Sequence, residues 1–495
     1  MLPSVADLLR LSDFACAALR TTFTASGFDA QLVREAESYS PGMLRGPRLP
    51  LIRWWLERRD GPGAALARLF AFDDTLDEPT ASRILGARLF DELIAAGVLA
   101  RSSGGITSQY LLLPIQNGLF VLSDRLGRDP DAVMGPGGGT EHLGSLVPSG
   151  FSGSALDIGC GAGTLALIAA RRGAARSVGV DLNPRAIELA RMNARLNALA
   201  AEFHAGDGVD PVEGERFDLV LSQPPFVVKP KDHAGATFLF GGPTGDEIPF
   251  RFVAAVPRIL AAGGRALVLM QSAERDGAPF ATRVRAALGD APVDVLALIT
   301  RAPPPAVQAS VFAGFEDPTL GERYGVIARG YLDTFAELAM EAFDGALIAI
   351  SARADPSANQ SNYTLGLKLS GSYYDSDALE LYLRGLALHD AADVVLERAS
   401  LGLAPHARLA RELSTAQDPG EPAAVLRIDF PGIGSIWPLG VGELSVLAAV
   451  DGADSVGAAL DRLAAGEVTK APPPKQALLA FVRSALVRGA LALRD

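Results

Sequence analysis

Strand-like and helix-like runs alternate without interruption between residues 155 and 300, and this alternation constrains the fold more than any other feature. Apolar runs such as SALDIG, SVGVDL, FDLVLSQ and RALVLMQS are separated by segments such as TLALIAARRG and PRAIELARMNARLNAL, whose apolar residues recur at helical spacing. Strands that alternate with helices in this way form a parallel sheet with helices packed on both faces. The sequence therefore predicts an α/β fold with a doubly wound parallel sheet.

The chain of 495 residues is too long for one hydrophobic core, and its texture changes on both sides of the alternating segment. Residues 1–130 are helical in pattern and end in two strand-like runs within YLLLPIQNGLFVLSD, which indicates a winged-helix-like module. A glycine-rich segment at 134–148 then predicts a hinge or an active-site loop. We expect three domains, at 1–130, 131–355 and 356–495, the last being an α+β accessory domain of unknown role.

The formal net charge of -12 argues against a protein that grips nucleic acid with its whole surface, although a local basic groove would be compatible with it. The N-terminal module has no cluster of Lys or Arg on its expected recognition helix, so we expect it to form a homodimer contact or to close over a substrate. Two cysteines, Cys16 and Cys160, are too few for a disulfide framework or a cysteine-based zinc site. With no export or membrane signal visible, we expect a cytoplasmic protein that needs no metal and has no membrane partner.

A glycine-rich turn, DIGCGAG at 157–163, follows the first strand of the alternating segment and precedes its helix. Glycines allow the backbone to turn tightly and to approach a ligand, whose polar groups can meet free N–H groups at the helix N-terminus. Such a turn alone would also fit a plain connection or a dinucleotide site. The leading acid and the DxGxGxG spacing, however, differ from the GxGxxG pattern of nicotinamide enzymes.

Polar residues follow each of the next three strands. Asp181 ends the second strand, where a carboxylate can accept both ribose hydroxyls of a nucleoside-containing cofactor. Asp207, within HAGDG, follows the third strand and is placed to meet an adenine amino group. The segment SQPPF, at 222–226, follows the fourth. Four such motifs in this order are far more specific than any one of them.

This order of motifs resembles that of class I S-adenosylmethionine-dependent methyltransferases over about residues 131–355. The resemblance implies a Rossmann-like fold and S-adenosyl-L-methionine as cofactor, with the first motif at its methionine part, the second acid at its ribose and the third motif at its adenine. The cofactor-binding residues that it implies are Asp157, Gly159, Cys160, Gly161, Gly163, Asp181, Leu182, Asp207, Gly208 and Ser222.

The fourth motif is similar to the Asn-Pro-Pro-Phe/Tyr signature of enzymes that methylate planar nitrogens, in nucleic-acid bases or in the glutamine of release factors. In such a site an amide oxygen and a proline carbonyl accept the hydrogens of the planar NH2 group, and the aromatic ring stacks on it. The residues carried over as catalytic are Gln223, Pro224 and Phe226. Gln223 departs from the signature, because its amide stands on a longer arm than that of asparagine.

The segment FGGPTGDE, at 240–247, together with Arg251 and Phe252, resembles the loop and helix of the release-factor-glutamine and ribosomal-guanine branches of the small methyltransferase domain type, where this loop borders the substrate pocket. Two histidines are further candidates: His142 as a base in the glycine-rich segment, and His233 at the substrate entrance.

Three functions remain open at this point. One is a methyltransferase that acts on a macromolecule, either an RNA or DNA base or a protein glutamine. Another is a small-molecule methyltransferase, which predicts an enclosed apolar cavity capped by the N-terminal module. The third is a non-catalytic regulator that binds the cofactor.

Overall fold

The computed structural model divides into two compact units, Met1–Pro356 with Thr364–Gly366, and Ser357–Tyr363 with Leu367–Asp495. The first unit therefore contains both the N-terminal segment and the alternating segment, and the division into three domains stays a prediction. The structure describes residues 2–42, 44–125, 129–231, 237–273, 278–353, 362–368, 376–389, 391–405, 407–410, 424–430, 433–466 and 474–494.

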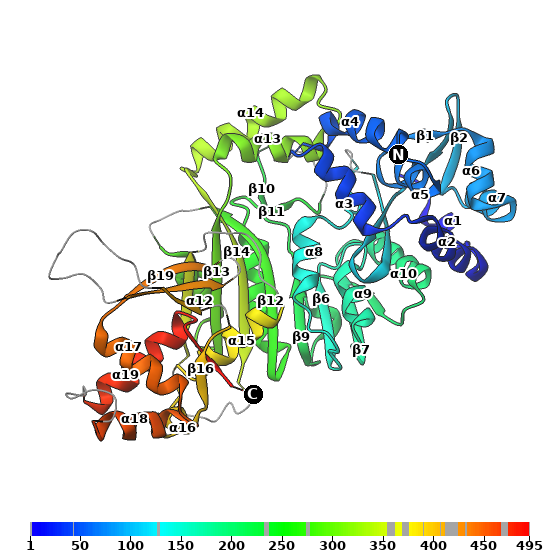
Figure 1. The fold of residues 1–495 in the computed structure, drawn as a ribbon. Coiled ribbons are helices and arrows are strands. Elements are labelled where there is room, and N and C mark those ends of the chain that lie inside the picture. The colour runs from blue at the N-terminus through cyan, green and yellow to red at the C-terminus, as the bar shows by residue number, and fades with distance from the viewer. Residues whose placement is uncertain are drawn as a thin grey trace. The chain divides into compact units, whose positions relative to one another are not determined.

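In the described residues of the first unit, the main element is an eight-stranded sheet with the order β15-β13-β14-β12-β9-β6-β7-β8 (Figure 1). The alternating pattern thus produces the expected Rossmann-like α/β fold. Its strands are β6 (Ser154–Ile158), β7 (Arg176–Asp181), β8 (Glu202–Ala205), β9 (Phe217–Ser222), β12 (Leu260–Ala273), β13 (Val293–Arg301), β14 (Phe343–Ala352) and β15 (Thr364–Lys368).

The strands of the alternating segment, β6 to β9, β12 and β13, run in one direction as expected, and the sheet is mixed because β14, which lies beyond that segment, runs in the opposite direction. β14 runs antiparallel to both β12 and β13, whereas β6 to β9 and β12 pair in parallel. The physical reason lies in the connection. The chain leaves β13 at Arg301 and returns directly opposite it, since Arg301 pairs with Asp344, so β14 must run in the reverse direction.

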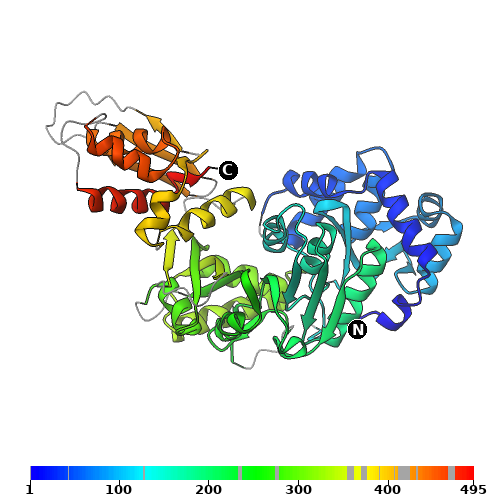
Figure 2. The same cartoon turned by 90° about the horizontal axis from the view of Figure 1, so that it is seen from below.

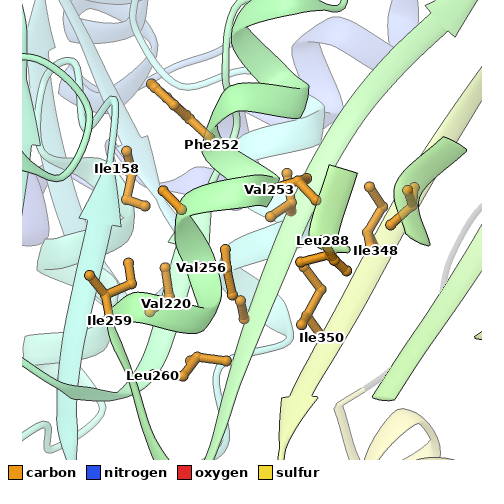
Figure 3. Close-up of a cluster of buried hydrophobic side chains, with 14 of the residues drawn as sticks. Ile158, Val220, Phe252, Val253, Val256, Ile259, Leu260, Leu288, Ile348 and Ile350 are labelled. Atoms are coloured by element: carbon orange, nitrogen blue, oxygen red, sulfur yellow. The ribbon is translucent and has the colours of Figure 1, made fainter. Parts of the chain in front are cut away.

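Helices cover the sheet as the 3.6-residue periodicity predicts. They are α9 (Thr164–Arg171), α10 (Pro184–Asn197), α11 (Glu247–Ala255) and α12 (Phe280–Leu288). Figure 3 shows part of the resulting core, in which Val220 of β9, Val253 of α11 and Ile348 of β14 are all buried. This packing fixes the strand ends that carry the motifs.

The N-terminal segment is mostly helical. Its elements are α1 (Val5–Leu8), α2 (Asp13–Ser26), α3 (Ala30–Tyr39), α4 (Arg45–Glu57), α5 (Pro62–Leu66), the π-helix η1 (Ala67–Ala71), β1 (Thr75–Leu76), α6 (Glu78–Leu85), α7 (Ala87–Ala95), β2 (Leu99–Ser102), β3 (Gly105–Ser108), β4 (Leu111–Ile115), the 3-10 turn η2 (Gln116–Gly118) and β5 (Leu119–Ser123). The strand-like runs at 110–124 form the β4–β5 hairpin. A different hairpin, β2–β3, directly follows α6 and α7 and pairs with β1.

Two asparagines on α10 join the N-terminal segment to the sheet domain. The N–H groups of Phe120 and Leu122 on β5 donate to the side-chain oxygens of Asn197 and Asn193, at 2.9 and 2.8 Å. The two side-chain amides donate in return to the carbonyls of the same β5 residues. Both asparagines are buried, so their amides take the place of a neighbouring strand along this edge of β5. Figure 2 shows the blue N-terminal helices beside the cyan and green part of the chain that contains α10.

The glycine-rich segment at 134–148, expected to be a hinge or loop, contains a helix, α8 (Gly138–Ser145). Its glycines allow close packing: a Cβ atom added at Gly144 would lie 2.4 Å from Cδ1 of Ile168 on α9. Residues 134–137 precede the helix without regular secondary structure. About half of the segment is therefore a helix that packs on α9.

A helical pair, α13 (Pro305–Glu316) and α14 (Glu322–Glu337), is inserted between β13 and β14. It packs on the short parallel pair of β10 (Val227–Val228) and β11 (Phe240–Gly242), and this contact forms a second core that includes Phe312 and Tyr331. The pair lies beyond the alternating segment that the sequence pattern identified.

In its described residues, the second unit contains helices and short antiparallel sheets. Its elements are α15 (Ser376–Ala387), α16 (Asp393–Arg398), β16 (Leu401–Leu403), β17 (Ala407–Ala410), β18 (Ala424–Phe430), β19 (Ile433–Leu439), α17 (Val441–Asp451), α18 (Val456–Ala464), α19 (Lys475–Val487) and β20 (Leu491–Leu493). β16 pairs with β20, and β17, β18 and β19 form one sheet. Across the parts of the chain that the structure describes, we find no helix with the length and apolar character that a membrane crossing requires.

Candidate functional site

A cavity of about 810 Å³ opens at the carboxyl ends of β6, β7, β8 and β9. Parallel strands end at the same edge of a sheet, so residues that follow them meet there although they are distant in sequence. The cavity wall includes Asp157, Asp181, Asp207 and Gln223, one from each of the four predicted motifs. The other expected site residues on the wall are Gly159, Cys160, Gly161, Leu182, Gly208, Pro224 and Phe226.

Gly163 and Ser222 are not among the lining residues, and the structure gives each of them a packing or hydrogen-bonding role instead. Gly163 has a φ of 82°, and an added Cβ would lie 2.9 Å from Cβ of Ala190 and 3.0 Å from Phe203. It therefore allows the glycine turn to pack against α10. The hydroxyl of Ser222 donates to the carbonyl of Ile158 at 2.9 Å and is fully buried. This bond ties the end of β9 to the end of β6.

Asp157 connects the first motif to the start of α9. Its Oδ2 accepts the N–H of Ala166 at 3.2 Å, one of the donors that a helix leaves unpaired in its first turn. The side chain is buried. Burial, and to a lesser extent the neighbouring Asp181 carboxylate, raise the pKa of Asp157 to about 7. A positively charged ligand in the cavity would favour the ionised form of this carboxyl group.

Asp181 holds both neighbouring turns in place. Its Oδ2 accepts the N–H of Gly161 at 2.8 Å, and its Oδ1 accepts the N–H of Asn183 at 2.9 Å. A carboxylate oxygen can accept two hydrogen bonds, so each oxygen retains capacity for a ligand hydroxyl. Burial raises the pKa of Asp181 despite these two bonds. Leu182, the next residue, is 60% exposed and adds apolar surface to the wall.

Asp207 forms a bidentate pair with Arg251 of α11, with contacts of 2.8 and 2.6 Å to its two oxygens. The next residue of α11, Phe252, brings an aromatic ring to the same place. A Cβ added at Gly159 or Gly208 would lie 3.7 or 3.6 Å from this ring, so Phe252 bridges the first and third motifs. Arg251 and Phe252, which belong to the helix after the loop expected to border the substrate, thus contact the motifs expected to hold the cofactor.

Gln223 is positioned by a residue that was not predicted. The hydroxyl of Thr140, on α8, donates to Oε1 of Gln223 at 2.7 Å. Gly139 lies against the same amide, since an added Cβ would be 2.9 Å from its Nε2. Thr140 lines the cavity and is the only hydroxyl residue in the sequence run GPGGGTEH, which is the signal that could have identified it.

The loop at 240–247, which was expected to border the substrate, is anchored through Asp246 by residues of neighbouring elements. Asp246 accepts hydrogen bonds from Thr244 and Ser272, each at 2.8 Å, and pairs with Arg283 of α12. Its side chain is 4% exposed. Although burial raises the pKa of Asp246, these hydrogen bonds lower it below the ordinary value. The loop in turn packs closely on the fourth motif, because an added Cβ at Gly245 would lie 2.8 Å from the carbonyl oxygen of Phe226.

The cavity has a roof made of two segments from distant parts of the chain. The start of α4 contributes Leu44, Arg45 and Leu49. The region of α13 and the following turn contributes Gln308, Val311, Phe312, Gly314, Phe315, Pro318 and Leu320. The segments touch closely, since an added Cβ at Gly46 would lie 2.3 Å from the carbonyl oxygen of Pro318.

Neither histidine candidate is supported as a cavity residue. His142 lies on α8, is not a lining residue, and burial lowers its pKa. His233 falls outside the described residues. A buried carboxylate at Asp157, a partly buried one at Asp181 and an aromatic ring instead characterise the described site, and this set fits a ligand that carries hydroxyl groups, positive charge and a flat ring.

Comparison with known proteins agrees with this geometry. Residues 136–276 match the family model of the methyltransferase small domain. The chain is 35% identical over 130 residues to the release factor glutamine methyltransferase of Caulobacter vibrioides, which corresponds to 24% of this chain and 45% of that protein. It is 39% identical over 89 residues to the ribosomal RNA small subunit methyltransferase C of Haemophilus influenzae, with 18% and 27% covered.

Among solved structures, the ribosomal protein L11 methylase of Lactobacillus delbrueckii subsp. bulgaricus is similar, with a TM-score of 0.26, 18% identity, and 34% of this chain and 76% of that chain covered. The chain spans less than half the length of the two methyltransferases named above. The family match confirms the predicted domain, which is of the class I S-adenosylmethionine-dependent methyltransferase type, and with it S-adenosyl-L-methionine as the cofactor.

Proposed function

We propose that this protein transfers the methyl group of S-adenosyl-L-methionine to a planar nitrogen that is held by Gln223, the carbonyl of Pro224 and the ring of Phe226. The observation that carries the proposal is the Gln223 side chain on the cavity wall, whose amide is held by Thr140 next to the cofactor motifs. Because Thr140 donates to Oε1, one lone pair of that oxygen remains to accept a hydrogen from an acceptor NH2 group.

The reaction needs positioning more than acid or base help. When bound, the cofactor supplies an electrophilic methyl group on a sulfonium sulfur. Gln223 and Pro224 would accept the two hydrogens of the acceptor nitrogen and thereby direct its lone pair toward the methyl carbon. The new N–C bond forms as the C–S bond breaks, and the nitrogen then loses one proton to solvent.

For the cofactor we propose the expected division of roles, with changes at two positions. Asp181 accepts ribose hydroxyls, Asp157 faces the charged methionine part, and Asp207, with Gly208 and Phe252, frames the adenine. Gly163 and Ser222 act indirectly, because they shape the turn and the strand end.

A small-molecule acceptor is the second candidate, and the roofed cavity favours it. Gly46 and Pro318, which are in close contact, both line the cavity, as expected for a pocket that the N-terminal segment helps to cap. The relatives act, by their names, on a release factor glutamine and on ribosomal RNA. An RNA base or a glutamine side chain would have to enter as a single protruding group. Location in the cytoplasm and homodimer formation stay predictions.

Replacing Gln223 with alanine tests the proposal. We expect Gln223→Ala to bind S-adenosylhomocysteine like the wild type and to lose about 100-fold or more in methyl transfer, the cost of one positioned hydrogen bond in the transition state. Transfer is measured from radiolabelled S-adenosylmethionine into RNA, protein and small-molecule fractions of an extract, assayed separately. The labelled fraction identifies the class of acceptor.

The matched control is Gln271→Ala, because Gln271 is a second glutamine on the cavity wall. We expect it to retain transfer, and Thr140→Val to lose part of it. Equal labelling by Gln223→Ala and by the wild type would refute the assigned role of Gln223.

The raised pKa of Asp157 predicts a pH dependence of cofactor binding. The cofactor carries positive charge, which stabilises the ionised carboxylate, lowers its pKa and so releases a proton on binding. Affinity should therefore rise as the pH increases toward about 7 and level off above it. Calorimetric titration in two buffers of different ionisation enthalpy measures the released proton. 5′-Methylthioadenosine, which lacks both positive charges, should release none, and equal release by both ligands would contradict the prediction.

A further inference from the structure

A cluster of arginines surrounds residues 71–73, at the end of the π-helix η1. Arg45 donates to the carbonyl of Ala71, and Arg53 donates to the carbonyls of Phe72 and Asp73. Arg125 forms an ion pair with the Asp73 carboxylate. The three arginines, which we call the arginine cluster, are thus gathered around one short piece of backbone.

Positive charge is in excess at this place. Asp73 and Glu37 supply carboxylates here, while Arg48 adds a further guanidinium group that acts on Arg45. Among these residues, four guanidinium groups therefore stand against two carboxylates. In a chain with a net charge of -12 this is a local exception.

The arginine cluster is also poorly solvated. The Arg125 side chain is 29% exposed, and its buried Nε has no hydrogen-bond partner among the residues that the structure describes. Burial, together with repulsion from Arg45 and Arg53, lowers the pKa of Arg125 to about 10. Burial lowers the pKa of Arg45 as well. Buried groups of like charge that repel one another are stabilised when an anion binds between or beside them.

Two members of the arginine cluster face the candidate active site. Arg45 and Arg125 both line the cavity, as do Glu37 and Asp73. All four residues precede the predicted cofactor motifs in sequence and come from the N-terminal segment. Arg53 donates to two backbone carbonyls and is not a lining residue, so it adds charge from behind.

We propose that Arg45 and Arg125 form a subsite for an anionic group of the methyl acceptor, a carboxylate or a phosphate ester, which is bound while its planar nitrogen lies at Gln223. The inference rests on the proposed function, since it describes the acceptor of that reaction. Planar guanidinium groups suit either anion, because both offer paired oxygens that a guanidinium can contact bidentately. The acceptor is therefore an anion rather than a neutral compound.

The test uses the full chain saturated with S-adenosylhomocysteine and titrated with inorganic phosphate or with acetate at constant ionic strength. Binding is followed by calorimetry and by the shift of the thermal unfolding midpoint. We expect at least one of the two anions to bind the wild-type complex, and Arg125→Met to weaken that binding at least tenfold. Arg125→Lys keeps the positive charge but not the two-pronged guanidinium group, so its affinity for the anion should lie between those of the wild type and Arg125→Met.

The matched control is Arg68→Met. Arg68 is a partly buried arginine that pairs at 2.6 Å with Asp74, the residue after Asp73. Its ion pair therefore resembles that of Arg125 with Asp73, but Arg68 does not line the cavity. We expect it to bind the anion like the wild type. Wild-type affinity of Arg125→Met for S-adenosylhomocysteine would show that the variant folds and that its cofactor site is intact.

The outcomes separate the two proposals. Binding of phosphate alone assigns a phosphate ester, and binding of acetate alone assigns a carboxylate. Failure of both anions to bind a complex that holds S-adenosylhomocysteine overturns the anion subsite only, and equal binding by Arg125→Met does the same. If Arg125→Met weakens S-adenosylhomocysteine itself, the arginines serve the cofactor carboxylate and the subsite is refuted. Failure of the wild type to bind S-adenosylhomocysteine refutes the proposed function.

Discussion

Asp181→Ala should lower the affinity for S-adenosylhomocysteine by about 100-fold or more, since hydrogen bonds to a charged group contribute about 1.5 to 3 kcal/mol each and two ribose hydroxyls lose their acceptor. The variant also releases the N–H groups of Gly161 and Asn183, which the carboxylate now holds at 2.8 and 2.9 Å. The glycine turn would therefore lose its fixed position as well as its ligand contact.

Calorimetric titration of the purified variant measures this loss. Asp181→Asn should show a smaller loss, because an amide oxygen retains part of the acceptor capacity. Asp210→Ala removes an exposed carboxylate three residues beyond Asp207 and serves as the control, with affinity expected at the wild-type level. If Asp181→Ala binds as tightly as this control, the second motif does not hold the ribose.

Asp246→Ala is expected to destabilise the first unit by about 3 to 5 kcal/mol, the typical cost of removing one partner of a buried ion pair. Arg283, whose side chain is 19% exposed, would keep its charge without the carboxylate, and Thr244 and Ser272 would lose an acceptor. The measurement is urea-induced unfolding. The relevant unfolding transition is the one that S-adenosylhomocysteine shifts to higher urea concentration, because that transition reports on the unit that contains the site.

The contrast is Glu78→Ala. Glu78 forms a well-aligned pair with Arg101, but both side chains are exposed and screened by solvent, so the loss of stability should be much smaller than that of Asp246→Ala. Similar losses in the two variants would mean that burial of the Asp246 pair has no special effect on stability.

The alternating pattern of strands and helices was sufficient to predict the order of the main-sheet strands and covering helices from β6 to β13, because each of them shows its periodicity locally, but not the short strands β10 and β11. It was not sufficient for β14. That strand is buried along its centre and belongs to the sheet through its pairing with β12 and β13, whose paired residues lie 43 to 86 positions earlier in the sequence. Strand direction is likewise a property of the pairing and has no local signature in FDGALIAISA.

For the site, the four motifs could be located from sequence because parallel strands bring their ends together whatever the loops contain. The helix α8 was missed because its glycines, which favour a loop by propensity, are selected here by close packing against Gln223 and Ile168. Thr140 was missed for the same reason. The roof and the arginine cluster could not be predicted, since Leu44, Arg125 and Pro318 meet only in three dimensions and share no pattern.

Adjacent antiparallel strands need only a short turn between them, yet β13 and β14 are separated by the whole of α13 and α14. The chain leaves and re-enters the sheet at the paired residues Arg301 and Asp344, so the helical pair can change in length or sequence without altering the register of a single strand. The four motifs of the candidate site lie on other connections. The helices α13 and α14 can therefore be exchanged in evolution as one insertion between β13 and β14. Such an exchange would change the cover of the pocket, and with it the choice of acceptor, while the strands that bind the methyl donor stay the same.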